Sequence, residues 1–155
     1  MEDPYELQRF VTAQDSSGTY LGAISELRAG RKMSHWMWFV FPQVAGLGHS
    51  PTSKMYAIRS LAEARAYLDH RVLGPRLRKS AHTVAEIKGR TAQQIMGGID
   101  AQKLHSSVTL FLRAAPEEPV FQQVLNQYFE GLPDAATDRL LTGQGSPPGT
   151  SSSRC

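Results

Sequence analysis

Apolar residues recur along the chain at the three- and four-residue spacing of amphipathic helices. Leu104, Val108 and Phe111 fall on one helical face. The same spacing appears around residues 7–11, 21–28, 64–68, 77–87 and 121–129. No segment alternates apolar and polar residues between turn signals, so we expect few or no strands. The pattern predicts an all-α fold, a single compact domain of about seven or eight helices.

Capping residues and glycines set the expected helix boundaries. An oxygen-bearing side chain at the N-cap accepts a hydrogen bond from a free backbone N–H of the first turn, and Glu or Gln three residues later completes a capping box. Glycine often ends a helix because it tolerates the left-handed conformation. The predicted starts are Asp3 with Pro4, Ser60 with Glu63, Pro75, Thr91 with Gln94, Asp100, Pro119 and Asp134; the predicted stops are Gly30, Gly89, Gly97 with Gly98, and Gly131.

The last residues differ in composition from the rest of the chain. Residues 143–153 are almost entirely Gly, Ser, Pro, Thr and Gln. Such a segment has little apolar surface to bury, so it cannot offset the entropy lost on ordering. We therefore expect a helical domain over residues 1–142 and a disordered tail over residues 143–155.

An aromatic run at residues 35–43, His-Trp-Met-Trp-Phe-Val-Phe-Pro-Gln, is the most distinctive segment of the chain. Its apolar middle, residues 36–41, is too short for periodicity to separate a buried strand from a buried helix. Each Trp or Phe buries about 150–250 Å². This middle is therefore expected to be a central core segment.

The polar ends of the aromatic run are harder to explain by packing. His35 and Gln43 place polar groups beside an apolar wall, and Gly46, Gly48 and the helix-capping Ser50 follow in the next loop. Glycines let backbone N–H groups approach a ligand closely. The loop is not a phosphate fingerprint, because the third glycine and the preceding strand are missing. It remains a candidate ligand-binding loop.

A second candidate site lies on the helix predicted after Asp100. Lys103 and Ser107 are four residues apart, at the border of the apolar stripe. A partly desolvated lysine there is suited to act as a base for a hydroxyl or to hold an anion. The alternative is structural: a capping aspartate, a lysine whose stem covers apolar surface, and serines that allow close helix packing.

Composition and charge exclude several classes of protein. The chain has 155 residues, which suits one domain, and its only cysteine is the terminal Cys155. An internal disulfide is therefore impossible, and the five histidines have no metal-ligand spacing. The longest apolar run is far shorter than a membrane span of about 20 residues, and the acidic N-terminus does not resemble a signal peptide. We expect a cytoplasmic protein with no metal and no cofactor.

The formal net charge is +3, and most of the positive excess lies in one stretch, with a second small cluster at Arg28, Arg31 and Lys32. Clustered positive charge attracts polyanions such as nucleic acid. However, the stretch has no interleaved aromatics for base stacking, and a solvated helix face gives the same pattern. Its basic residues are Arg71, Arg76, Arg78, Lys79, Lys88 and Arg90, against Glu86 alone.

These segments together resemble a known family. The block Ser-His-Trp-Met-Trp-Phe-Val-Phe-Pro-Gln at residues 34–43 is similar to the central block of domain-of-unknown-function family 1810. The resemblance continues, in order, at residues 3–14, 27–32, 46–51, 56–58, 63–68, 73–77 and 103–111. Departures at residues 15–18 and at Val108 look like loop and packing changes. The resemblance implies a compact all-helical protein of bacterial type and no function. Some relatives carry the label calpastatin, but calpain inhibitors of that kind are long, repeat-rich chains.

A fainter similarity is to YbiA-like, NADAR-type helical proteins, which act on ADP-ribose-linked bases. It consists of a Gln-x-Phe helix opening, a tryptophan-bearing segment and a lysine on a late helix. Because similar helical scaffolds host unrelated activities, it is an analogy.

Three functional hypotheses follow. The first is a site for a nucleotide or an ADP-ribose derivative, and it predicts that its residues converge on one cleft. The second is a non-catalytic module whose basic face binds an acidic partner or nucleic acid, and the third is a helical protein whose aromatic run is wholly buried. In the first hypothesis Trp36 or Trp38 stacks on a base, Arg31 or Lys32 meets phosphate, and His35 and Lys103 transfer protons, with Ser107, Gln43, Gly46, Gly48 and Ser50 nearby.

Overall fold

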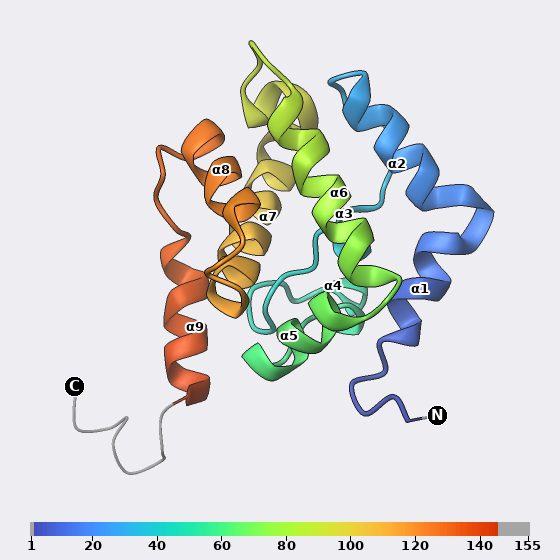
Figure 1. Cartoon of the computed structure of the whole chain (residues 1–155), viewed down its shortest axis with the longest axis vertical. Coiled ribbons are helices and arrows are strands. Elements are labelled where there is room, and N and C mark those ends of the chain that lie inside the picture. Colours follow the sequence, from blue (N-terminus) through green and yellow to red (C-terminus); the bar gives the residue numbers. More distant parts are fainter. Residues whose placement is uncertain (1, 146–155) are drawn as a thin grey trace.

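The computed structural model describes residues 2–145, and the regular elements there are helical (Figure 1). This confirms the predicted all-α fold. A single isolated bridge, between Val44 and Ile58, is the only strand-like pairing within the described residues. The helices are α1 (Gln8–Asp15), the short 3₁₀ helix η1 (Ser16–Gly18), α2 (Thr19–Arg28), α3 (Met37–Val40), α4 (Pro51–Met55), α5 (Leu61–Asp69), α6 (Leu73–Glu86), α7 (Ala92–Ala114), α8 (Pro119–Tyr128) and α9 (Ala135–Gly145).

Most helix starts follow the capping signals. The Ser60 hydroxyl accepts a hydrogen bond from the Glu63 N–H at the start of α5. Thr91 and Gln94 form the full capping box of α7. Pro119 is the first residue of α8. These starts are well predicted because a cap depends only on residues within one turn.

Three helix starts differ from the prediction, one of them at Asp100, which lies inside α7 and does not cap a new helix. The first helix begins at Gln8, because Glu6 has a φ of +54° that interrupts a right-handed helix. Asp3 still caps it: its two carboxylate oxygens accept from the N–H groups of Leu7 and Gln8, at 2.8 and 2.9 Å. The helix predicted to start at Pro75 begins earlier, at Leu73.

The long helix α7 is interrupted at Gly97, whose φ and ψ are +85° and 162°. Glycine alone adopts this conformation readily, because it has no Cβ. The predicted stop at Gly97 and Gly98 is thus a break within one element. Past the break, the helix continues through Lys103 to Ala114.

The aromatic run forms a short helix at the centre of the molecule. Trp36, Met37, Val40 and Phe41 are each at most 1% exposed, as expected for a core segment. Trp38 and Phe39 are only half-buried, so the run also reaches the surface. Figure 1 shows α6 and α7 in the middle, α1 and α2 on one side, and α8 and α9 on the other.

The end of the described chain departs from the predicted tail. The helix α9 continues to Gly145, so residues 143–145 are helical. Residues 146–155 of the predicted tail lie outside the described residues. Within residues 2–145, no helix has the length and apolar character needed to cross a membrane.

Candidate functional site

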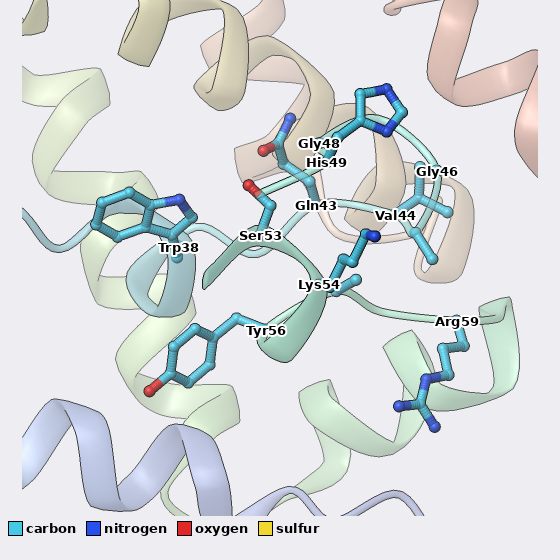
Figure 2. Close-up of a pocket in the computed structure, with 12 residues that line it drawn as sticks. Trp38, Gln43, Val44, Gly46, Gly48, His49, Ser53, Lys54, Tyr56 and Arg59 are labelled. Atoms are coloured by element: carbon cyan, nitrogen blue, oxygen red, sulfur yellow. The ribbon is translucent and has the colours of Figure 1, made fainter. Parts of the chain in front are cut away.

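A first cavity, of about 330 Å³, lies between the aromatic run and the segment that follows it (Figure 2). The isolated bridge closes the base of this loop: the Ala45 N–H donates to the Ile58 carbonyl and the Ile58 N–H to the Gln43 carbonyl, both at 2.8 Å. The lining residues are Trp38, Gln43, Val44, Ala45, Gly46, Gly48, His49, Ser53, Lys54, Tyr56, Ala57 and Arg59.

Close packing shapes the glycine loop that lines the first cavity. A Cβ on Gly48 would lie 2.5 Å from the side chain of Ser53, so the loop can approach α4 only with glycine there. Gly46 has a φ of +105° and faces Leu140 of α9. Ser50 caps α4 by accepting from the Ser53 N–H at 3.1 Å. The two glycines and Ser50 thus have structural roles in forming the cavity wall.

The polar head groups in the first cavity are mostly uncommitted. Lys54 and Arg59 make no side-chain hydrogen bond or ion pair within residues 2–145, and no carboxylate among the described residues lines the cavity. The Trp38 Nε1–H is buried and has no hydrogen-bond partner in the described part of the chain. Gln43 and Ser53 are exceptions: Gln43 Nε2 donates to the Ser106 hydroxyl, and the Ser53 hydroxyl accepts from that of Ser50, both at 2.9 Å. Free cations facing a cavity favour an anionic ligand.

A second cavity, of about 370 Å³, neighbours the first. Trp38 lines both cavities, and we refer to its position as the boundary between them. The second cavity combines apolar and cationic walls. Its lining residues are Lys32, His35, Trp36, Met37, Trp38, Met96, Gly97, Gly98, Ile99, Asp100 and Lys103.

Two lysines share one carboxylate in the second cavity. Lys32 Nζ lies 2.8 Å from Asp100 Oδ2, and Lys103 Nζ lies 3.8 Å from Asp100 Oδ1. Each ammonium also lies over an indole ring: Lys32 is 5.0 Å from the centroid of Trp36, and Lys103 is 4.6 Å from that of Trp38. Each lysine thus makes a cation–π contact as well as an ion pair. With one carboxylate for two lysines, this cavity also has an excess of positive charge.

Glu26 of α2 fixes the loop that carries Lys32 and His35. Its carboxylate accepts from the N–H groups of Met33 and Ser34, from the Ser34 hydroxyl, and from Trp36 Nε1. Burial opposes ionisation of Glu26, but the hydrogen bonds from Ser34, Met33 and Trp36 together outweigh it and lower its pKa to about 2. The loop is therefore held by an ionised carboxylate at neutral pH.

The structure brings together most of the residues that the sequence singled out, but in two cavities. His35, Lys32, Trp36 and Lys103 line the second cavity, so His35 and Lys103 lie at one site. Gln43, Gly46 and Gly48 line the first, and Trp38 lines both.

Three candidates line neither cavity: Ser107, Arg31 and Ser50, which caps α4. Ser107 is completely buried, has no hydrogen-bond partner among the described residues and lines neither cavity. It makes no hydrogen bond with Lys103, which points over Trp38 instead. This geometry does not suit a hydroxyl nucleophile. Arg31 is exposed and also lines neither cavity.

Sequence reasoning missed several lining residues. Asp100 was predicted only as a helix cap, and Gly97 only as a helix stop. Tyr56 belongs to the family-like block at residues 56–58 and Arg59 follows it, but neither was singled out as a site residue. One usable signal was present: Lys54 and Arg59 closely follow the glycine loop, and both enter the same cavity as that loop.

The described residues contain no group of three or more His, Cys, Asp and Glu side chains that could hold a metal ion. Among the described residues, neither cavity therefore holds such a group. Cations, an imidazole and an indole ring line each cavity; the first adds an amide and hydroxyls, and the second adds the Asp100 carboxylate.

Comparison with known proteins identifies relatives across nearly the whole chain. The crystal structure of the conserved hypothetical protein Rv1873 from Mycobacterium tuberculosis is 48% identical, covers 90% of this chain and 99% of its own, and superposes with a TM-score of 0.87. None of the curated proteins compared matches the chain. Neither reported match is to a YbiA-like or NADAR-type protein, so that similarity stays an analogy. The family model described as "Protein of unknown function (DUF1810)" matches residues 4–141, and the chain therefore belongs to that family.

Proposed function

We propose that this protein binds a nucleotide or an ADP-ribose derivative in the bacterial cytoplasm, with the first cavity as the primary site. The observation that carries the proposal is the pair of uncommitted cations, Lys54 and Arg59, in a cavity that also has two aromatic rings. Figure 2 shows Trp38 and Tyr56 at the left of the view, Lys54 near the centre, and Arg59 at the right with its guanidinium turned downward. A ligand with a flat ring at one end and a phosphate at the other matches this arrangement.

The chemistry of these rings and cations supports a nucleotide over a simple anion. Aromatic side chains stack on bases, and alanine substitution of one such residue costs about 1–3 kcal/mol per base. Arginine meets phosphate through a planar fork of N–H donors, and lysine meets it as a point charge. The buried Trp38 Nε1–H adds a donor that protein groups in the described residues leave unpaired, which is unfavourable without an acceptor.

Any chemical reaction of the bound ligand would take place in the second cavity. His35 and Lys103 line it, which keeps both available to a group that extends past Trp38. Lys103, with its contacts to Asp100 and Trp38, is better placed to hold an anion than to abstract a proton. His35 is exposed and is the better candidate for proton transfer.

The competing module hypothesis finds less support in the geometry. Arg76 pairs with Asp15 at 2.8 Å, and Arg78 makes two hydrogen bonds of 2.7 Å with the carboxylate of Glu118. Their charges are thus partly neutralised and directed toward different helices. The stretch offers a polyanion fewer free cations than its sequence suggests.

Calorimetric titration with AMP, ADP-ribose and inorganic phosphate tests the proposal. AMP or ADP-ribose should bind, and a ligand at 100 times its dissociation constant should raise the melting temperature by about 5–10 °C. Lys54→Gln should weaken binding about tenfold, because it removes a charge-assisted contact. The matched control is Lys79→Gln, an exposed lysine of α6 away from both cavities. No binding of either nucleotide, or equal effects of the two substitutions, contradicts the proposal.

A further inference from the structure

The two cavities are each small for a ligand of ordinary size. Small-molecule sites span about 300–1,000 Å³. The first cavity has about 330 Å³ and the second about 370 Å³, so each alone is near the lower limit. Because both are lined by Trp38, one ligand that passes this ring would occupy both and reach the middle of that range.

The cations are placed at separate points along this double cavity. Lys54 and Arg59 line the first cavity, to the right of Trp38 in Figure 2. Lys103 lies at the boundary, with its ammonium 4.6 Å from the centroid of the Trp38 ring. A ligand that satisfies both sets of cations needs two separated anionic groups, with an aromatic ring between them beside Trp38.

Lys103 can turn toward a ligand without leaving a carboxylate unpaired. It is the weaker partner of Asp100, at 3.8 Å, and its side chain is 20% exposed. Lys32 holds the same carboxylate at 2.8 Å and is only 7% exposed. If Lys103 moves to a phosphate, Lys32 still neutralises Asp100, so no buried charge is stranded.

The far part of the second cavity is suited to a second ring. Trp36, Met96 and Ile99 form its apolar wall. Ile99 is 78% exposed although it is large and apolar, so it remains available for contact with a bound group. A base that extends past Lys103 would cover this wall and remove apolar surface from water.

We propose that the ligand is a 5′-phosphorylated dinucleotide unit that spans both cavities; this inference rests on the proposed function. The 5′-phosphate meets Lys54 and Arg59, and the first base lies beside Trp38. The internal phosphate meets Lys103, and the second base lies against the exposed Ile99. ADP-ribose fits this order of charges less well, because its two phosphates are adjacent and not separated by a nucleoside.

The test compares AMP, ADP-ribose and the 5′-phosphorylated dinucleotide pApA by calorimetry. The wild-type protein should bind pApA about tenfold or more tightly than AMP, since a second charge-assisted contact forms. Lys103→Gln should shrink this difference to less than about threefold. Lys103→Arg, which keeps the charge, should retain most of it, and Lys79→Gln should leave it unchanged. Melting temperatures of the variants verify that each is folded.

The outcomes separate this inference from the proposed function. Equal affinity for pApA and AMP, with Lys54→Gln still weakening AMP, overturns the double-cavity ligand and leaves nucleotide binding intact. Tighter binding of ADP-ribose than of pApA overturns the assigned order of charges. A failure of all three ligands to bind removes the proposed function itself. A 5′-phosphorylated oligoadenylate shows where the dinucleotide unit comes from. If it binds as tightly as pApA, the ligand is the 5′ end of a longer chain. If it does not bind, the ligand is the free dinucleotide.

Discussion

At the scale of single residues, Glu26 shows how one carboxylate can organise a binding wall. It accepts hydrogen bonds from two backbone N–H groups, a hydroxyl and the Trp36 indole, all within the loop that leads into α3. Because these donors prefer an ionised acceptor, they hold its pKa well below that of a free glutamate, at about 2. The position of His35 and Lys32 in the second cavity therefore depends on a charge in α2.

Glu26→Gln should destabilise the protein at neutral pH and change its pH dependence. A lowered folded-state pKa contributes stability that is present above the unfolded value of 4.5 and is lost as pH falls toward 2. After allowance for solvent screening of this partly exposed group, we expect a loss of about 1–2 kcal/mol at pH 7. The difference between wild type and variant should shrink as the pH falls from 5 toward 2, and urea unfolding at pH 7, 4 and 3 measures it.

The exposed Glu2 provides a control, since Glu2→Gln should change the unfolding free energy by less than about 0.5 kcal/mol. A difference between wild type and Glu26→Gln that stays constant from pH 7 to pH 3 would show that the carboxylate charge is not what holds the loop.

At the scale of elements, local signals predicted the helices well and their interruptions less well. The caps at Ser60 and Thr91 form as expected, because each involves residues within one turn. Asp3 caps a helix that begins later than predicted, because Glu6 adopts a positive φ that no sequence rule indicated. Gly97 was predicted to end a helix, and its non-helical backbone does interrupt α7 there, although the chain resumes a helical course directly after it.

Gly97→Ala and Gly98→Ala should have opposite effects on stability. Gly97 has a φ of +85° and a ψ of 162°, a conformation that costs a residue with a Cβ about 1–3 kcal/mol. Gly98 has no positive φ, and the space that an alanine methyl group would occupy there is open, so alanine should stabilise the helix by about 0.5–1 kcal/mol. Urea unfolding of the two variants measures the contrast. Equal stabilities would mean that α7 can straighten through Gly97 at no cost.

At the scale of the whole molecule, the site was only partly predictable. The first cavity is lined by residues 38–59 alone, but the second joins segments that are distant in sequence. Residues 32–38 meet residues 96–103 in the second cavity. The sequence marked His35, Trp38 and Lys103 because each places polar or aromatic chemistry beside an apolar stripe. The sequence could not show that two lysines share Asp100, or that Ser107 is buried outside both cavities. Both features depend on tertiary packing.

Arg9 links the N-terminal segment to the wall of the first cavity, although it lines neither cavity. Its guanidinium donates to the carbonyls of Met55 and Ala57, at 2.7 and 2.9 Å, and to the Glu63 carboxylate at 3.1 Å. It also donates to two carbonyls that precede α1. Glu63 in turn accepts from the Arg59 N–H at 3.0 Å, so this network fixes the backbone on which Arg59 is carried.

Arg9→Lys should therefore reduce both stability and ligand binding. An ammonium has three donors and no planar fork, so it cannot satisfy the same acceptors, and we expect a loss of about 2–3 kcal/mol in unfolding free energy. Because residues 55–59 would lose their anchor, AMP should also bind more weakly, although Arg9 lies outside the cavity. Arg65→Lys, at an exposed position of α5, should change stability by less than about 0.5 kcal/mol. If Arg9→Lys lowers stability but binds AMP as the wild type does, the network supports the fold without positioning the first cavity.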